Sequence, residues 1–145
     1  MRVEDIMTPN PHCVAPTDSV VRAALLMRDH DVGMIPVVDT DRRPIGVLTD
    51  RDIAIRHVAV AHRGDCPCEA AMTRGELACV RPDDDVSDVL RSMKASSVRR
   101  VLVTDDAGRL VGVVAEADLL RHANEIGEHA VVESLEAISE PTVVH

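Results

Sequence analysis

The sequence repeats itself at an offset of 66 residues, and no other feature limits the possible folds of the chain so strongly. The motif Cys13-Val14-Ala15-Pro16 recurs as Cys79-Val80-Arg81-Pro82. The same offset also matches Asp18 with Asp84, Met27 with Met93, Gly46-Val47 with Gly112-Val113, and Asp52 with Asp118. Internal repetition at a fixed spacing indicates two copies of one supersecondary unit, each too small to bury its apolar face alone. The chain must therefore fold as two similar units.

Each copy contains the pattern of two helices and a hairpin. Apolar residues at i, i+3, i+4 and i+7 predict amphipathic helices that begin at Val20 and Val86. Two β-rich runs with a polar turn between them then predict a hairpin in each copy. These runs are 32–38 with 44–48, and 98–103 with 110–114. Short strands near Val14 and Val80, and second helices over 50–60 and 116–123, complete a strand–helix–strand–strand–helix unit.

The expected fold class is therefore α+β, built from two such repeats and a C-terminal helix. We expect a first repeat over 1–60, a linker over 61–67 and a second repeat over 68–123. Residues 124–145 have no counterpart in the first copy, and their pattern predicts a helix over about 128–138 followed by a tail.

Charge and composition exclude several classes of partner. The chain has 16 Lys and Arg against 25 Asp and Glu, a formal net charge of −9. This balance repels phosphate backbones and anionic lipid, and without Phe, Tyr or Trp no aromatic platform can stack bases. No apolar run approaches the ~20 residues that cross a bilayer, and the N-terminus lacks a signal-peptide core. We expect no nucleic-acid or membrane partner, and a cytoplasmic protein.

No enzyme signature is found in the sequence. Neither GxGxxG nor GxxxxGK occurs among the scattered glycines. Asp39 and Asp41 have the spacing of the start of a Ca²⁺ loop, but Arg43 and Pro44 stand where the next ligand and the turn glycine belong. We therefore expect a non-enzymatic protein with no obligatory cofactor.

The strongest candidates for a ligand-binding site lie where a strand leads into a helix. They are Gly46-Val47-Leu48-Thr49-Asp50-Arg51-Asp52 and the copy of this segment at 112–118. Backbone N–H groups at a helix start favour a bound anion, and a neighbouring carboxylate can accept hydrogen bonds from a ribose diol. The alternative is that Thr-x-x-Asp forms a capping box, which only stabilises the helix. The second copy keeps Asp118 but has Ala115 in place of the hydroxyl. Both interpretations remain open.

Two further groups of residues admit two interpretations each. Arg99 and Arg100 could bind phosphate as bidentate forks, or pair with acidic neighbours on the surface. His62, Cys66 and Cys68 could supply three ligands to Zn²⁺, although Cys66 and Cys68 are separated by one residue rather than two. The alternative is a polar loop between the repeats that carries two thiols. Cys13 and Cys79 are expected to be small buried residues.

In order and in duplicate, these motifs resemble a pair of CBS domains, a family named after cystathionine β-synthase. The resemblance covers residues 3–123, and it is carried by Val3-Glu4-Asp5-Ile6-Met7-Thr8, Gly33-Met34-Ile35-Pro36-Val37-Val38-Asp39 and Gly46-Val47-Leu48-Thr49-Asp50-Arg51-Asp52. It implies two β-α-β-β-α repeats packed through their sheets into a pseudo-twofold module. It also implies a homodimer, in which two modules pair into a disc.

The resemblance further implies a regulatory module that binds an adenine nucleotide (AMP, ADP, ATP or S-adenosylmethionine) in clefts between the repeats and reports energy state. Matching positions assign ribose and phosphate contacts to Thr49 and Asp52, and a second ribose contact to Asp118. Matching positions also assign phosphate contacts to Arg99 and Arg100. The adenine walls would be Val14, Ile35, Pro36 and Val80.

Two departures from the family pattern concern the second cleft, which could be empty. Ala115 replaces Thr or Ser, and Leu102 stands where the first copy has Pro36. Two other functions therefore stay open. One is a protein-interaction or stress-response module whose vestigial clefts leave it to dock on a protein target. The other is a metal or redox sensor built on His62, Cys66 and Cys68.

Overall fold

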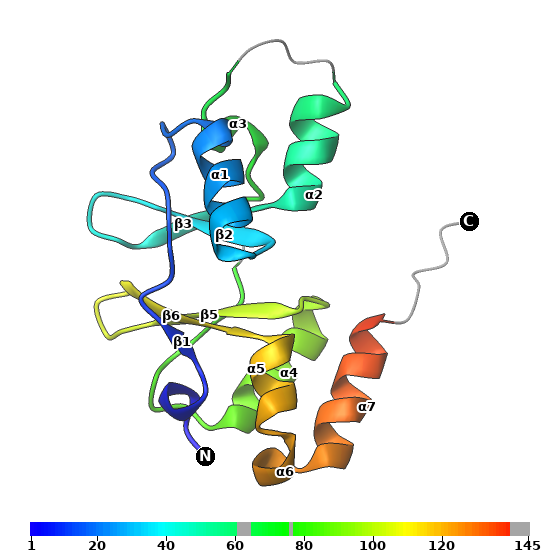
Figure 1. Cartoon of the computed structure of the whole chain (residues 1–145). Helices are drawn as coiled ribbons and strands as arrows, with labels where there is room; N and C mark the ends of the chain where they lie inside the picture. The colour runs from blue at the N-terminus through cyan, green and yellow to red at the C-terminus, as the bar shows by residue number, and fades with distance from the viewer. Residues whose placement is uncertain (61–64, 76, 140–145) are drawn as a thin grey trace. The chain divides into compact units, whose positions relative to one another are not determined.

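The structure is a computed structural model of the chain, and it describes residues 1–60, 65–75 and 77–139 (Figure 1). The chain divides into two compact units. Unit 1 takes Met1–Asn10, Ala78–Ala107 and the chain from Val111 onward, whereas unit 2 takes Pro11–Leu77 and Gly108–Leu110. The boundaries expected at 1–60 and 68–123 follow the repeats along the sequence. Each compact unit instead includes the opening segment of the other repeat.

Unit 1 is built on a four-stranded sheet with the order β1-β6-β5-β4. β1 pairs antiparallel with β6, so that Thr8 lies opposite Val113. β4 pairs parallel with β5, so that Val80 lies opposite Val103. The four strands are β1 (Thr8–Pro9), β4 (Cys79–Val80), β5 (Arg100–Thr104) and β6 (Leu110–Ala115).

The helices of unit 1 lie on one face of this sheet (Figure 1). They are the short 3₁₀ turn η1 (Val3–Asp5), α4 (Val86–Ser96), α5 (Glu116–Arg121), α6 (Ala123–Ile126) and α7 (Glu128–Ser139). α4 begins where the pattern predicts, and Asp85 caps it by accepting a hydrogen bond from the Ser87 N–H at 3.0 Å. The predicted C-terminal helix is α7, and its buried Val131 and Leu135 belong to the same apolar core as α4. Across the described residues, no helix has the length and apolar character needed to cross a membrane.

Unit 2 repeats this plan with fewer paired residues. Its elements are α1 (Val20–His30), β2 (Met34–Val38), β3 (Pro44–Thr49), α2 (Asp50–Ile53), η2 (Ala54–Val58) and α3 (Cys68–Ala71). β2 and β3 form the predicted antiparallel hairpin, and Ile35 lies opposite Leu48. Val14 bridges Val37 in parallel and Thr73 bridges Val47 antiparallel. These two bridges correspond to β4 on β5 and β1 on β6 in unit 1. The predicted α+β fold with two similar units is confirmed.

The second helix of the first repeat differs from the expected continuous helix over 50–60. After one turn of α2 the backbone widens into η2, a π-helical segment in which the Ala59 N–H donates to the Ala54 carbonyl at 2.8 Å. In the second repeat, α5 remains α-helical to Arg121. The two helices that carry Asp52 and Asp118 therefore diverge within four residues of those carboxylates.

The cysteines lie differently from the expectation. Cys66 and Cys68 are buried in the core of unit 2, so the interpretation that a polar loop between the repeats carries these two thiols is wrong. The reason is that two backbone hydrogen bonds fix this segment to the start of α1, from Val20 N–H to the Cys66 carbonyl and from Cys68 N–H to the Asp18 carbonyl. Cys79, expected to be buried, is exposed, and Cys13 is half-buried. All four are free thiols.

Candidate functional site

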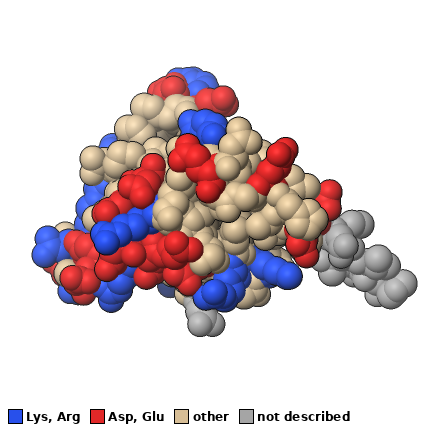
Figure 2. Space-filling view, turned by 90° about the horizontal axis from the view of Figure 1, so that it is seen from below, with Lys and Arg blue, Asp and Glu red and all other residues tan. Residues whose placement is uncertain are grey.

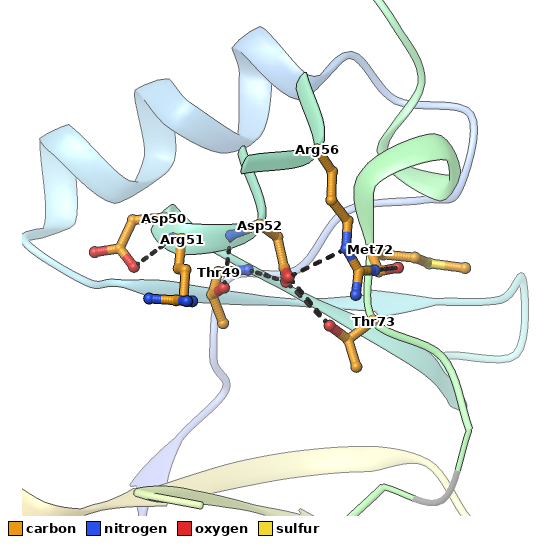
Figure 3. A network of polar contacts seen from close by, with 7 residues as sticks. All are labelled: Thr49, Asp50, Arg51, Asp52, Arg56, Met72 and Thr73. Atoms are coloured by element: carbon orange, nitrogen blue, oxygen red, sulfur yellow. Dashed lines mark hydrogen bonds and ion pairs between the residues drawn. The ribbon is translucent and has the colours of Figure 1, made fainter. Parts of the chain in front are cut away.

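Thr49 and Asp52 meet where β3 ends and α2 begins (Figure 3). The Asp52 N–H donates to the Thr49 hydroxyl oxygen at 3.0 Å, and the Thr49 N–H donates to Asp52 Oδ2 at 3.0 Å. These reciprocal bonds form a complete capping box. The helix-capping interpretation of Thr-x-x-Asp is therefore realised in this copy, and any ligand would bind to side chains that also hold the helix start.

Two further residues hold the Asp52 carboxylate (Figure 3). The Thr73 hydroxyl donates to it and lies 3.2 Å from Oδ1 and 3.3 Å from Oδ2. Arg56 forms an ion pair with Nε 3.9 Å from Oδ1, while its Nη1 donates to the Met72 carbonyl at 2.9 Å. A capping box requires neither partner. Sequence reasoning missed both Thr73 and Arg56, although the match of Met72-Thr73 with Met7-Thr8 was the available signal.

A glycine lets the Met-Thr segment approach the hairpin in each unit. A Cβ atom on Gly46 would lie 2.7 Å from Met72 Sδ and 2.9 Å from the Thr73 carbonyl oxygen. A Cβ atom on Gly112 would lie 2.6 Å from Met7 Sδ. The 2.9 Å separation from a backbone oxygen is too short for a real side chain, so the approach of the Met-Thr segment requires glycine at position 46, whereas the short contact at Gly112 is with the flexible end of Met7. The repeated Gly-Val and Met-Thr motifs therefore serve one packing arrangement.

Asp118 occupies the corresponding place in unit 1. The Ala115 N–H donates to Asp118 Oδ2 at 2.8 Å, and the Thr8 hydroxyl donates to Oδ1 at 3.4 Å. The Arg121 guanidinium also donates to Oδ1 through Nη2. Because Ala115 has no side-chain oxygen, only one half of the capping box is formed here. The threonine partner is thus common to both copies, whereas the hydroxyl at the helix start is not.

The two arginines flank the start of α5. The Arg99 carbonyl accepts a hydrogen bond from the Glu116 N–H at 3.1 Å, and Arg99 Nε lies 3.9 Å from Glu116 Oε2. Arg100 is exposed at the first position of β5. The structure places both arginines in unit 1 with Asp118 and Val80, and places Thr49, Asp52, Val14, Ile35 and Pro36 in unit 2.

Arginines that pair with nearby carboxylates recur over the surface. On the face shown in Figure 2, Lys and Arg side chains lie next to Asp and Glu side chains. Arg91 donates to Asp88 at 2.8 Å, and Arg2 Nη1 lies 3.6 Å from Glu4 Oε1. The Arg99–Glu116 pair belongs to the same pattern, so a phosphate would compete with a carboxylate for this arginine.

The residues assigned to the adenine walls are buried. Val14 and Ile35 belong to the apolar core of unit 2, and Val80 belongs to that of unit 1. The Pro36 carbonyl accepts a hydrogen bond from the Val14 N–H at 3.0 Å. These residues set the position of the central strands, and their contact with an adenine stays a prediction.

The thiols of unit 2 are held as neutral groups. Cys66 Sγ lies 3.0 Å from His57 Nδ1, and Cys68 Sγ lies 3.5 Å from the Ser19 carbonyl oxygen. Burial, reinforced by Asp65, raises the pKa of Cys66. Burial, reinforced by Asp18, raises the pKa of Cys68 to about 11. His62 lies outside the described residues, and within the described part of the chain no three His, Cys, Asp or Glu side chains are grouped to hold a metal ion.

Comparison with known proteins gives matches over nearly the whole chain. The CBS domain family model matches residues 3–57 and again residues 68–125. Hypoxic response protein 1 of Mycobacterium tuberculosis is 36% identical over 137 residues, which cover 94% of this chain and 93% of that protein. The order and spacing of both repeats are therefore shared with this relative.

Solved structures agree with the fold. The crystal structure of hypoxic response protein I with two coordinated zinc ions has a TM-score of 0.72 at 34% identity, covering 84% of this chain and 98% of that one. CBSX2 in complex with AMP has a TM-score of 0.73 at 26% identity, covering 86% and 97%. The CBS domain pair of protein MJ0100 with 5′-methylthioadenosine and S-adenosyl-L-methionine has a TM-score of 0.74 at 29% identity, also covering 86% and 97%.

Proposed function

Because this chain belongs to the CBS domain family, with a match in each repeat, we propose that it is a non-enzymatic regulatory module that binds an adenosine-containing nucleotide. The observation that carries the proposal is the shared environment of Asp52 and Asp118. In each unit, a carboxylate on the third residue of a helix is held by a threonine hydroxyl. A carboxylate fixed beside a strand-to-helix junction can accept hydrogen bonds from a vicinal ribose diol.

The adenosine part of the ligand is supported by two structural neighbours. CBSX2 was solved with AMP, and the CBS pair of MJ0100 with 5′-methylthioadenosine and S-adenosyl-L-methionine. AMP, ADP, ATP and S-adenosylmethionine are therefore the candidate ligands for this chain. In our proposal Asp52 and Asp118 are the candidate ribose acceptors, Arg99 and Arg100 the candidate phosphate ligands, and Val14, Ile35, Pro36 and Val80 the candidate adenine contacts. The expected homodimer and cytoplasmic location belong to the same proposal.

Helix capping and ligand binding are compatible at Thr49. Its hydroxyl oxygen accepts the Asp52 N–H, but a hydroxyl also has one hydrogen to donate. That hydrogen can be donated to a phosphate oxygen while the cap remains intact. The Asp52 carboxylate likewise retains acceptor capacity beside its bond from the Thr49 N–H.

Thermal unfolding in the presence of single ligands tests the proposal. We expect one or more of AMP, ADP, ATP and S-adenosylmethionine to raise the melting temperature, and GMP and GTP at equal concentration to leave it unchanged. A ligand at 100 times its dissociation constant should stabilise the folded state by about 2.7 kcal/mol. If no adenosine ligand shifts the transition, the chain is better described as an interaction module that docks on a protein target.

The metal-sensor alternative leads to a different result. A relative has been solved with two coordinated zinc ions, and the 3.0 Å contact between Cys66 Sγ and His57 Nδ1 brings two zinc-ligating residue types together here. Metal analysis of the purified protein distinguishes the two functions. Stoichiometric zinc that is lost in the variant Cys66→Ser would support the sensor, whereas a metal-free protein that responds to nucleotide supports our proposal.

A further inference from the structure

The two carboxylates differ in the residue three positions further along the helix. In unit 1 this residue is Arg121, which donates directly to Asp118 Oδ1. In unit 2 the matching residue is Ile55, which is 47% exposed. The arginine of unit 2 comes one residue later: Arg56 Nε stays 3.9 Å from Asp52 Oδ1, beyond hydrogen-bonding distance. Only one of the two carboxylates is therefore hydrogen-bonded to a guanidinium.

The position of each arginine along its helix and its hydrogen-bond partner explain this difference. On a regular α-helix, side chains at i and i+3 are neighbours on one face. α5 keeps this geometry through Arg121, so the guanidinium lies against Asp118. Beyond Asp52 the backbone widens into η2. There Arg56 donates to the Met72 carbonyl instead, at 2.9 Å (Figure 3).

The number of open acceptor positions then decides which carboxylate can receive a diol. An ionised carboxylate offers about four acceptor positions. Hydrogen bonds from the described residues fill two around Asp52, from the Thr49 N–H and the Thr73 hydroxyl. They fill three around Asp118, from the Ala115 N–H, the Thr8 hydroxyl and Arg121. A vicinal diol that donates two hydrogen bonds needs two open positions, which remain at Asp52 alone.

Exposure and the helix start favour the same carboxylate. The side chain of Asp52 is 11% exposed, against 4% for Asp118. Thr49 also offers a hydroxyl beside Asp52, whereas Ala115 offers none beside Asp118. Exposure and the hydroxyl thus separate the two copies in the same direction as the number of open acceptor positions.

We propose that Arg121 blocks Asp118 as a nucleotide acceptor, so that each chain binds one adenosine ligand and binds it at Asp52. Arg121 is then the residue that sets the number of ligands per chain. This inference rests on the proposed function, because it assumes that the ribose hydroxyls donate to these carboxylates. The inference also gives the two repeats different roles. The carboxylate of Asp52 can accept hydrogen bonds from a ligand, whereas that of Asp118 is occupied by its ion pair with Arg121.

Isothermal titration calorimetry with AMP, and separately with S-adenosylmethionine, tests the inference through the stoichiometry. We expect one ligand per wild-type chain and two per chain in Arg121→Ile, which gives the second copy the residue of the first. The matched control is Arg91→Ile, because Arg91 also pairs with an aspartate three residues away, on α4 and apart from either carboxylate. Its stoichiometry should stay at one.

A second variant keeps the inference testable if Arg121→Ile unfolds because Asp118 is left unpaired. Asp52→Ala should weaken binding of the single ligand at least tenfold if Asp118 is closed, whereas one ligand per chain should remain at wild-type affinity if both carboxylates are receptive. Two ligands per wild-type chain, or one ligand bound at wild-type affinity by folded Asp52→Ala, would overturn the inference and leave the proposed function standing. Absence of binding by wild type and by Arg121→Ile would overturn both.

Discussion

Replacing Asp52 with alanine separates the two roles of this carboxylate, because capping affects stability and ligand binding affects affinity. The substitution removes the bond from the Thr49 N–H and the acceptor of the Thr73 hydroxyl. Loss of a helix cap costs about 1 kcal/mol. Thr73 is only half-buried, so water can replace the lost partner of its hydroxyl. We therefore expect the free energy of unfolding without ligand to fall by ~1–2 kcal/mol.

The effect on ligand binding should be larger. A hydrogen bond to a charged group contributes about 1.5–3 kcal/mol, and 1.4 kcal/mol corresponds to a tenfold change in affinity. Loss of one ribose bond should therefore weaken binding at least tenfold. At a ligand concentration 100 times the wild-type dissociation constant, the wild type gains about 2.7 kcal/mol of stability. A tenfold weaker variant gains only about 1.4 kcal/mol under the same conditions.

Urea unfolding with and without AMP measures both quantities, and Asp88→Ala is the matched control. Asp88 is also the third residue of a helix, and it accepts a hydrogen bond from the N–H of the capping residue Asp85 at 3.2 Å. Its loss should cost similar stability and leave the ligand-dependent gain unchanged. If Asp52→Ala also keeps the full gain, Thr49 and Asp52 only cap the helix, and the assignment of a ribose acceptor is refuted.

Three further outcomes are expected. Gly46→Ala should lower the free energy of unfolding in urea by ~1–3 kcal/mol, because its Cβ would lie 2.9 Å from the Thr73 carbonyl oxygen; wild-type stability would contradict the close approach. Cys68 has a pKa raised from 9.0 to about 11, so above pH 9 the unfolded chain loses this proton first. Stability should therefore fall as the pH rises from 9 towards 11, and Cys68→Ala should lose that part of the decline. Light scattering should give twice the chain mass of 15.7 kDa; a monomer at micromolar concentration would exclude the homodimer.

The sequence determined the repeated unit, because the signals that define it are local. The periodicity that begins at Val20 and Val86 depends on neighbours within two helical turns, and α1 and α4 begin at these residues. The polar turns and β-rich runs likewise give the hairpins of β2 with β3 and of β5 with β6. The repetition of Asp52 as Asp118 was also sufficient to select the strand-to-helix junctions as candidate sites.

Only the tertiary structure decided which residues surround those carboxylates. Thr73 reaches Asp52 across 21 positions of sequence, and Thr8 reaches Asp118 across 110. No local pattern encodes such contacts, because they depend on the opening segment of each repeat joining the compact unit of the other. The burial of Cys66 has the same origin, since backbone bonds to the start of α1 draw its segment into the core.

The difference between Arg56 and Arg121 shows where the sequence stops being sufficient. Both arginines follow an aspartate by three or four residues, and on a regular helix either spacing allows an ion pair. Arg56 donates to the Met72 carbonyl and its Nε stays 3.9 Å from Asp52 Oδ1, whereas Arg121 donates directly to Asp118. The sequence therefore determined that two carboxylates are present at equivalent positions. The side chains and backbone N–H groups brought to each one in the folded chain decided how many acceptor positions it keeps.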